Sequence, residues 1–393
     1  MNKSWNAARI AVCVVLLVSG AYSQQKLARN YEGAIAASRA AMRELVANGD
    51  TPGASIAVAA DGQLIWTEGF GYADVERRRL ATAETQFGIG SITKALTTAL
   101  FGLMVERGIV GWDVQVQKYL PDFPHKDITA RMIAGHTSGL GDRFDNANRL
   151  TTRHYDTNAA MTEILKEPLR HAPGTAYYYD TSSYTVLAAV LERKTGRSVR
   201  DLMEAEVLDP LGMEHTIVND GGAAPNPLRT VFHERTAQGK ILPVPRYDPS
   251  FKLAGAGYLS TSADLARFGL AFLPGSRGLS EKLKSEVLRP MTIADGSRPV
   301  TAMGGAMGLK DLGLGLGWNI AQDQKGRRVI HQPGGGPGIS SWLIVYPDER
   351  LVVAIVSNRT SAPVGGKALE ITTEAFLEAR SAGRSGRGSF NAR

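Results

Sequence analysis

The feature that most constrains this chain is the placement of its apolar patterns, because strand-like stretches occur near both ends and helix-like stretches fill the middle. Apolar and polar residues alternate over residues 54–71, around Asp61-Gly62. That dipeptide favours a tight hairpin turn, since both central residues take positive φ. Strand-like runs return at residues 327–332, 340–347 and 351–358. The sequence therefore predicts one antiparallel sheet assembled from N- and C-terminal strands.

Helical patterns flank and interrupt these strands. Residues 32–48 carry apolar positions at helical spacing and stop at Gly49, and a second such segment covers residues 366–380. Between them lie helical pieces broken by proline and glycine, without the fixed period of a solenoid. We predict an α+β fold, an α/β sandwich within one domain over residues 24–380. Its α/β part covers about residues 30–112 and 300–380, with a mostly helical part at about 113–299, and residues 381–393 form a disordered tail.

The first 23 residues have the pattern of a secretion signal. Lys3 and Arg9 precede an apolar run at residues 10–18, which ends in small residues. The run is too short to span a membrane comfortably. Cleavage near residues 21–23 would remove Cys13, the only cysteine, and would leave no disulfide or thiol chemistry. We expect an exported protein, periplasmic or secreted and not inserted in a membrane after cleavage, with an uncleaved signal anchor as the alternative.

The charge of the chain argues against nucleic acid as a partner. The formal charge is +7, but two of the cations lie in the predicted signal and three in the tail, so the folded body keeps +2. A nucleic-acid interface needs clustered lysine and arginine. The one short cluster, "ERRR" at residues 76–79, is typical of a solvated hairpin end.

The stretch "GIGSITKALTTALFGLMVERG", residues 88–108, holds the first candidate for chemistry. Ser91 and Lys94 are three positions apart at the start of an amphipathic helix, so both side chains can face one cleft. A serine needs a neighbouring base, and a desolvated lysine can lose its proton to serve as one. The first helical turn also offers unpaired N–H groups to an oxyanion. The alternative is that Ser91 only caps the helix while Lys94 extends into solvent.

Several blocks of the sequence, in their order, resemble the serine beta-lactamase-related family. The resemblance covers nearly the whole mature chain, and these blocks carry it: "FGIGSITKALTT", "IAGHTSGL", "PGTAYYYDTSSY", "PLGMEHT" and "GYLSTSADLARF". The family comprises class C beta-lactamases, low-molecular-weight penicillin-binding proteins, D-amino-peptide hydrolases and family VIII esterases. The text around the serine and around "YYYDTSSY" is most similar to LACTB-like serine proteases. The resemblance implies a beta-lactamase/transpeptidase-like fold.

The resemblance also implies roles for individual residues. Ser91 matches the acylated nucleophile, Lys94 its partner in the Ser-x-x-Lys motif, and Tyr179 the tyrosine of a Tyr-x-Asn element that shares the proton shuttle. Thr181 stands where that element has asparagine, and it lacks the separate amide donor and acceptor. This difference weakens the case for efficient beta-lactam turnover. The alternative for Tyr179 is that it only packs, as one of three adjacent tyrosines at residues 177–179.

A third family element, Lys-Thr-Gly or His-x-Gly, should lie on a strand lining the cleft. The resemblance places His331 in its lysine or histidine position, although Pro333 then occupies the glycine position and the run is one residue too long. Proline has no N–H, so an oxyanion donor would come from Gly334 or Gly335, with Gly335 preferred. The alternative is a structural strand histidine.

Other motifs are less specific. In "GHTSGL", His136, Thr137 and Ser138 are expected to shape the chain rather than to react. The histidines show no metal-ligand spacing, and we expect neither metal nor cofactor. The glycine runs at residues 304–317 and 334–338 fit neither a P-loop nor a dinucleotide-binding turn, and are expected to be flexible loops near a cleft. Ser91 also lacks the Gly-x-Ser-x-Gly context of an α/β-hydrolase.

We therefore expect an exported serine hydrolase that attacks an amide or ester carbonyl through a Ser91 acyl-enzyme. Lys94 and Tyr179 would exchange the proton, His331 would complete the polar wall, and Thr181 would contact the substrate. The alternative is a catalytically weak or silent protein that uses the cleft to bind peptide or cell-wall fragments. The sequence leaves the substrate and the oligomeric state open, because pocket shape decides among beta-lactam, D-amino peptide, ester and ordinary peptide.

Overall fold

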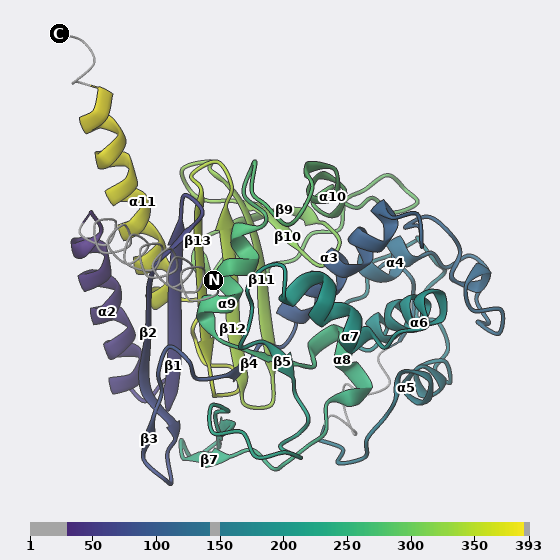
Figure 1. The fold of residues 1–393 in the computed structure, drawn as a ribbon, viewed down its shortest axis with the longest axis horizontal. Helices are drawn as coiled ribbons and strands as arrows, with labels where there is room; N and C mark the ends of the chain where they lie inside the picture. The colour runs from purple at the N-terminus through teal and green to yellow at the C-terminus, as the bar shows by residue number, and fades with distance from the viewer. Residues whose placement is uncertain (1–29, 142–149, 389–393) are drawn as a thin grey trace, which may run out of the picture.

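The structure, a computed structural model, describes residues 30–141 and 150–388 (Figure 1). Its centre is an eight-stranded antiparallel sheet in the order β3-β2-β1-β13-β12-β11-β10-β9. The predicted fold class is confirmed, because strands from both ends of the chain pair at the centre of this sheet. The strands are β1 (Gly53–Ala60), β2 (Gln63–Asp74), β3 (Arg79–Leu80), β9 (Lys310–Leu314), β10 (Asn319–Gln322), β11 (Arg328–Gly336), β12 (Ile339–Tyr346) and β13 (Leu351–Ser357).

Local sequence signals set the N-terminal elements. Asp61 and Gly62, with φ of 51° and 86°, form the turn of the β1–β2 hairpin, as the sequence predicts. Helix α2 (Glu32–Ala47) precedes the hairpin, and Gly49 follows the helix with a φ of 70°. Strand β1 then pairs with β13 along its length, from Ala54 with Ser357 to Ala60 with Leu351. The first and last strands of the chain are thus direct neighbours.

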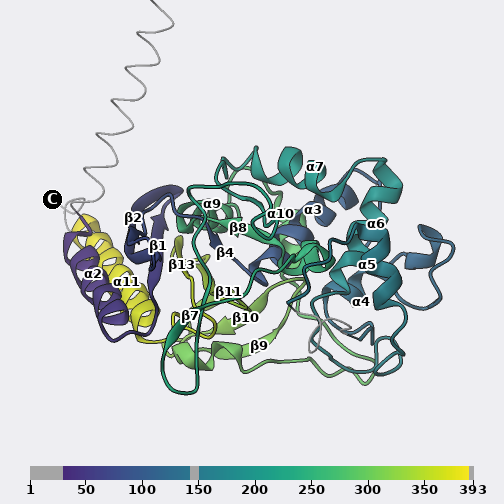
Figure 2. The ribbon, with the colours of Figure 1, turned by 90° about the horizontal axis from the view of Figure 1, so that it is seen from below.

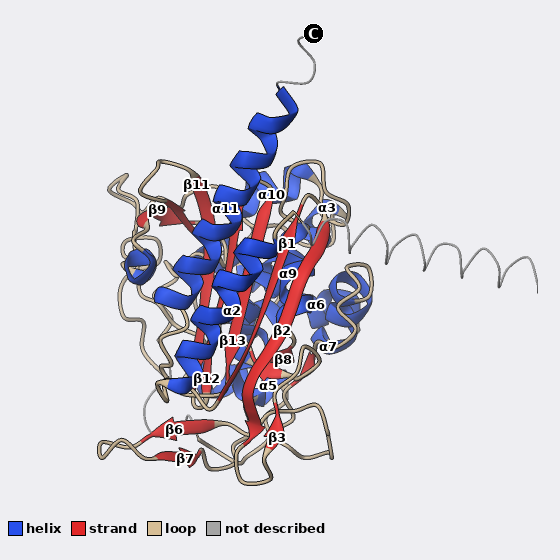
Figure 3. Ribbon diagram, turned by 90° about the vertical axis from the view of Figure 1, so that its left-hand side faces the viewer, coloured by secondary structure: helices blue, strands red, loops and turns tan. Residues whose placement is uncertain are grey.

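Two helical layers cover the sheet. Helices α2 and α11 (Lys367–Gly388) lie side by side on one face (Figures 2 and 3), and Tyr31 stacks on Phe376 between them at 5.3 Å. The other face packs against α3 (Ile92–Glu106), α9 (Ser262–Leu270) and the helical half of the molecule. That half also contains α4 (Ala130–Ala134), α5 (Thr157–Ile164), α6 (Tyr184–Thr195), α7 (Val199–Met203), α8 (Leu253–Ala256) and α10 (Glu281–Val287), with short turns η1 (Val116–Lys118), η2 (Glu204–Leu208), η3 (Ser250–Lys252) and η4 (Met303–Met307).

The middle of the chain, which the sequence predicts to be mostly helical, also contains short strands. It contributes four short strands, β5 (Ile217–Val218), β6 (His233–Arg235), β7 (Ile241–Pro243) and β8 (Tyr258–Ser260). Strand β8 pairs with β4 (Phe87–Gly88) on one side and β5 on the other. This small sheet holds the segment that leads into α3.

Two further expectations are wrong. Residues 304–317, expected to be a flexible loop, contain η4 and the edge strand β9, where Leu312 and Leu314 alternate with glycine and so leave only a weak strand pattern. Helix α11 also continues to Gly388, past the expected end at residue 380, and Ser381 Oγ donates a hydrogen bond to the Leu377 carbonyl. The predicted signal at residues 1–23 and the end of the predicted tail lie outside the described residues. Within the described parts, no helix has the length and apolar character needed to cross a bilayer.

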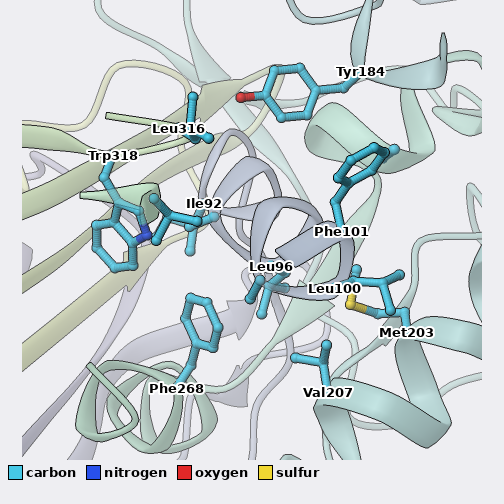
Figure 4. Close-up of a cluster of buried hydrophobic side chains, with 14 of the residues drawn as sticks. Ile92, Leu96, Leu100, Phe101, Tyr184, Met203, Val207, Phe268, Leu316 and Trp318 are labelled. Carbon is cyan, nitrogen blue, oxygen red and sulfur yellow. The ribbon is translucent and has the colours of Figure 1, made fainter. Parts of the chain in front are cut away.

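Helix α3 forms the centre of the larger core (Figure 4). Ile92, Leu96 and Leu100 are fully buried, and their side chains project from the helix in different directions. Phe268 and Trp318 pack against the helix from separate elements, with their rings stacked at 6.1 Å. The polar residues Thr93, Lys94, Thr97 and Thr98 are buried as well, so the first turns of α3 are packed on every side.

Candidate active site

The main chain before α3 fixes the position of Ser91. Ile89 N–H donates to the Tyr258 carbonyl at 3.1 Å, which extends the β4–β8 pairing. Gly90 then takes a φ of 50° and turns the chain into the helix. A Cβ at Gly90 would lie only 2.7 Å from Gly335 N and 2.8 Å from Gly335 O. Only glycine permits both the turn and this close approach to β11.

The side chain of Ser91 does not cap α3, contrary to the capping interpretation. Ser91 already has helical angles, φ −67° and ψ −5°, and makes no side-chain cap hydrogen bond. A capping residue has an extended backbone instead. The N–H groups of the first turn are not left unpaired either, because those of Ile92, Thr93 and Lys94 donate to carbonyls three residues back. For Ser91 N–H, the described residues provide no acceptor.

Two polar groups converge on Ser91 Oγ instead. Tyr179 Oη lies 2.6 Å away and Lys94 Nζ lies 3.1 Å away. Ser91 is 8% exposed and Lys94 only 1%. The structure thus brings together three residues that span 88 positions of sequence, in hydrogen-bonding geometry suited to proton transfer.

Lys94 is held by groups without formal charge. Its Nζ donates to Thr181 Oγ1 at 3.1 Å and to the Gly255 carbonyl at 3.2 Å. It also lies 4.8 Å from the Tyr179 ring centre and 5.4 Å from that of Tyr184. Within the described residues, its hydrogen-bond partners are Ser91, Thr181 and Gly255, and none of them is a carboxylate. Thr181, expected to contact the substrate, therefore lies on the lysine, where it can fix the position of Nζ.

His136 supports Tyr179 from behind. Its ring lies 4.5 Å from the tyrosine ring at 33°, and its Nδ1 accepts a hydrogen bond from Asp180 N–H at 3.4 Å. Burial, with a further contribution from the positive charge of Lys94, lowers the pKa of His136 well below its ordinary value. The imidazole is therefore neutral at neutral pH. His136 was expected only to shape the chain, and its contact with Tyr179 is one that spacing could not reveal.

His331 is not in the site, contrary to the expectation from the sequence. Its side chain is fully buried on the opposite face of the sheet, where Nε2 lies 2.8 Å from Asp311 Oδ1. The ring stacks on Trp342 at 5.3 Å. Trp342 belongs to the core beneath α2 and α11, whereas α3 packs on the other face. Because side chains alternate along a strand, a one-residue error in register moves a residue to the wrong face.

Gln332 occupies the place expected for His331. Its Nε2 donates to the Ser91 carbonyl at 3.3 Å and to the Pro333 carbonyl at 3.2 Å. Asn319 Nδ2 donates to Gln332 Oε1 at 3.2 Å and so sets the orientation of the amide. With Gln332 in the first position of the motif, Gly334 falls on the glycine and Pro333 in the middle. The two misfits noted in the sequence were therefore the signal that the register was shifted by one.

The two candidate oxyanion glycines have different surroundings. A Cβ at Gly334 would lie 2.0 Å from the Ile89 carbonyl oxygen, so Gly334 packs against the segment before the nucleophile. Gly335 has no heavy atom of the described residues within 4 Å of such a Cβ, but its N and O both lie beside Gly90. In an antiparallel strand, the N–H and C=O of one residue point to the same side. The N–H of Gly335 therefore faces the turn that carries Ser91.

The wall around the nucleophile is largely uncharged. A narrow cavity beside it is lined by the following residues: Lys94, His136, Tyr177, Tyr179, Asn319 and Gln332, together with Met303, Leu314, Gly315, Gly317 and Trp318. Among these lining residues of the described chain, Lys94 is the only Lys, Arg, Asp or Glu. Over residues 30–141 and 150–388, no group of three or more His, Cys, Asp or Glu side chains could hold a metal ion.

The hydrogen bonds of a serine to a buried lysine and to a tyrosine, beside an antiparallel sheet, are those expected for a serine hydrolase fold. Residues 39–375 match the family model described as Beta-lactamase, and the chain belongs to this family. The serine beta-lactamase-like protein LACTB, mitochondrial, of Homo sapiens is 26% identical to this chain over an alignment 447 residues long. The alignment covers 88% of this chain and 80% of that protein.

Solved structures share the fold. The D-amino acid amidase of Ochrobactrum anthropi SV3, complexed with L-phenylalanine, aligns with a TM-score of 0.75 and 20% identity, covering 88% of this chain and 99% of that one. EstCE1, a hydrolase with promiscuous acyltransferase activity, aligns with a TM-score of 0.70 and 18% identity, covering 92% and 99%. This chain thus shares its fold with an amidase and with a hydrolase that has promiscuous acyltransferase activity.

Proposed function

We propose that this protein is a serine hydrolase that cleaves an amide or ester through a covalent Ser91 acyl-enzyme. One observation carries the proposal: Tyr179 Oη and Lys94 Nζ both lie within hydrogen-bond distance of Ser91 Oγ, at 2.6 and 3.1 Å. A serine hydroxyl becomes nucleophilic when adjacent groups take its proton. The names of the amidase and of EstCE1 support the choice of amide and ester substrates.

The serine proton would move between Ser91 Oγ and the two groups that contact it, Lys94 Nζ and Tyr179 Oη. Ser91 Oγ attacks the carbonyl carbon while its proton passes to the Lys94 and Tyr179 pair, and the same pair then protonates the leaving amine or alcohol. Water enters, gives a proton to the pair and attacks the acyl carbon, and Ser91 regains its proton. The contacts of Lys94 with Thr181 and Gly255 keep Nζ in place through both halves of the reaction.

Two backbone N–H groups would stabilise the negative charge that develops on the carbonyl oxygen. Ser91 N–H has no acceptor within the described residues, and the N–H of Gly335 faces the same turn. Donors fixed in advance at the developing oxyanion contribute about 2.7–4 kcal/mol each to catalysis. The choice of Gly335 over Gly334 rests on the direction of its peptide group.

The substrate we propose carries no charge next to the scissile carbonyl. Gln332 is neutral at the motif position where lysine or histidine would be a cation, and Lys94 is already engaged by three oxygen atoms. A carboxylate placed there would lose water without gaining a counterion. Neutral esters and amides therefore fit better than substrates with a carboxylate beside the reacting bond. We also propose that the protein is exported, on the signal pattern of residues 1–23.

Labelling with a fluorophosphonate probe tests the nucleophile. Wild-type protein should be labelled at one residue, and Ser91→Ala should not be labelled at all. Ser297→Ala, which removes an exposed serine hydroxyl, is the matched control and should be labelled like the wild type. Undiminished labelling of Ser91→Ala would contradict the assignment.

Burst kinetics separate this function from that of a silent binding protein. An activated nitrophenyl ester should give a burst of about one product molecule per protein molecule if an acyl-enzyme accumulates. A protein that only binds peptide or cell-wall fragments gives no such product. One reason to consider a silent protein, the proline in the motif's glycine position, disappears with the corrected register of β11.

A further inference from the structure

A second cavity is lined by the turn between β2 and β3 and by residues between 221 and 247. It has a volume of about 440 Å³. Four arginines line it, Arg77, Arg79, Arg229 and Arg246, and Asp74 is the one acidic residue among the described lining residues. The "ERRR" cluster, which the sequence suggested was only a solvated hairpin end, therefore contributes two arginines to the wall of a cavity.

Carboxylates neutralise two of the four arginines. Arg77 Nη1 lies 2.9 Å from Asp74 Oδ2, and Arg229 Nη1 lies 2.7 Å from Asp220 Oδ1. Arg229 Nη2 also donates to Asn219 Oδ1 at 2.7 Å, which fixes the plane of its guanidinium. These two pairs carry no net charge between them.

The other two arginines keep their charge. Within the described residues, the ion pairs at this cavity involve Arg77 and Arg229 and neither Arg79 nor Arg246, although the charge of Arg79 also acts on Asp74. Arg79 is held in place because its Nη2 donates to the Arg229 carbonyl. Burial lowers the pKa of Arg229, Asp220 opposes this effect, and the nearby charge of Arg246 lowers it further. The cavity therefore holds an excess of two positive charges that an anion would offset.

Apart from Asn226 and Thr230, most of the remaining lining residues are apolar or aromatic. Phe232 and Tyr247 have their ring centres 6.3 Å apart, and the Arg229 guanidinium lies 5.7 Å from the Phe232 ring centre. Pro227 and Val244 complete this side. A ligand that fits must combine a compact anionic group with an apolar body.

We propose that this cavity is a binding site for a phosphomonoester whose phosphate carries an aromatic or similarly compact apolar group. The two arginines without carboxylates match the charge of a dianion, and the planar guanidinium binds phosphate oxygens in pairs. The Phe232 and Tyr247 rings contact the apolar group.

The phosphomonoester site is distinct from the site of Ser91, although the two are connected through the fold. They share no lining residue. Tyr247 Oη donates to the Pro337 carbonyl at 3.4 Å, in the turn that links β11 to β12. A Cβ at Gly88 would lie 3.2 Å from Phe232 Cζ, only three residues before Ser91. Because the two sites share no lining residue, we expect phosphomonoester binding to be independent of the nucleophile. Ser91→Ala should then bind a phosphomonoester as the wild type does.

Calorimetric titration with phenyl phosphate tests this proposal. Arg79→Ala and Arg246→Ala should each raise Kd about tenfold, because each removes a charge-assisted hydrogen bond. Arg43→Ala is the matched control, since it removes an exposed arginine on α2 on the other side of the sheet, and its Kd should stay within about twofold of the wild type. Inorganic phosphate should bind more weakly than phenyl phosphate because it lacks the apolar group, and benzoate more weakly because it carries one charge.

Thermal melting shows whether each variant is folded, and the exposed side chain of Arg246 makes Arg246→Ala the safer variant if Arg79→Ala does not fold. The proposal is overturned if the wild type does not bind phenyl phosphate at about 10 mM, or if Arg246→Ala binds it within about twofold of the wild type. If benzoate binds as tightly as phenyl phosphate, the site does not select a dianion. If inorganic phosphate binds as tightly, the apolar wall does not contribute to binding. Loss of binding in Ser91→Ala would show that phenyl phosphate binds the nucleophile's site instead.

Discussion

Replacement of Thr181 by valine tests whether the departure from the Tyr-x-Asn motif preserves its function. Valine has nearly the volume of threonine but no hydroxyl, so Thr181→Val removes the 3.1 Å hydrogen bond from Lys94 Nζ. Among the described residues, Nζ would keep the Gly255 carbonyl and Ser91 Oγ as hydrogen-bond partners. The lysine would then be free to move away from the nucleophile.

The structure sets the size of the expected effect. A hydrogen bond to a charged group contributes about 1.5–3 kcal/mol. If the full amount is lost from the transition state, kcat/KM for a nitrophenyl ester falls about 10- to 100-fold. The acylation rate, measured as the burst phase by stopped flow, should fall by the same factor, whereas binding of the substrate before acylation should change little.

Thr185→Val is the matched control for this prediction. Thr185 is a buried threonine near the start of α6, and its Oγ1 donates to the Phe251 carbonyl at 3.1 Å, away from Ser91. This variant should lose about 1 kcal/mol of unfolding free energy and keep its acylation rate. If Thr181→Val acylates within about twofold of the wild type while remaining folded, then Thr181 does not position Lys94, and the reasoning is refuted.

Three further predictions concern residues around the nucleophile. Gln332→Leu should lower kcat/KM about tenfold, because it removes an amide that faces the site. His331→Gln should lower the unfolding free energy but leave kcat within about threefold of the wild type. The opposite pattern in urea unfolding and turnover assays would place His331 in the site after all. Gly90→Ala should lower the unfolding free energy by about 1–2 kcal/mol because of the positive φ alone, and further because the new Cβ would clash with Gly335. A Cβ at Gly335 meets no described atom, so Gly335→Ala should have the melting temperature of the wild type in calorimetry. Because burial lowers the pKa of His136, the unfolded chain takes up a proton near pH 6.5 that the native state does not, so stability falls as pH drops below about 6.5. His136→Gln should lose less unfolding free energy than the wild type between about pH 7 and pH 5, and equal losses in urea titrations would show that His136 is not the group involved.

The sequence predicts those parts of the site that depend on local spacing. Ser91 and Lys94 lie one helical turn apart, so their meeting follows once the helix is predicted. The hairpin at Asp61-Gly62 follows in the same way from the φ angles that the turn demands. These features require no knowledge of what packs against them.

The parts that failed depend on partners distant in sequence. Whether His331 or Gln332 faces Ser91 is decided by the register of β11 against β12, and a strand has no local marker for its two faces when both are buried. The capping interpretation of Ser91 failed because its side chain meets Tyr179, which is 88 residues away. The arginines at residues 76–79 likewise gain their cavity only from the segment around Arg229 and Arg246, which no spacing rule links to the hairpin.

The pairing of β1 with β13 has a consequence for how the molecule is synthesised and folded. Ala54 of β1 pairs with Ser357 of β13, so most of the chain must be synthesised before β1 can pair with β13. Until then β1 has an open edge, the kind of surface that recruits other chains. Gln332 and Gly335 also emerge late, so no partly synthesised chain can assemble the wall opposite Ser91. A circular permutant that joins the neighbouring helices α11 and α2 would make this pairing local, and a lower contact order favours faster folding.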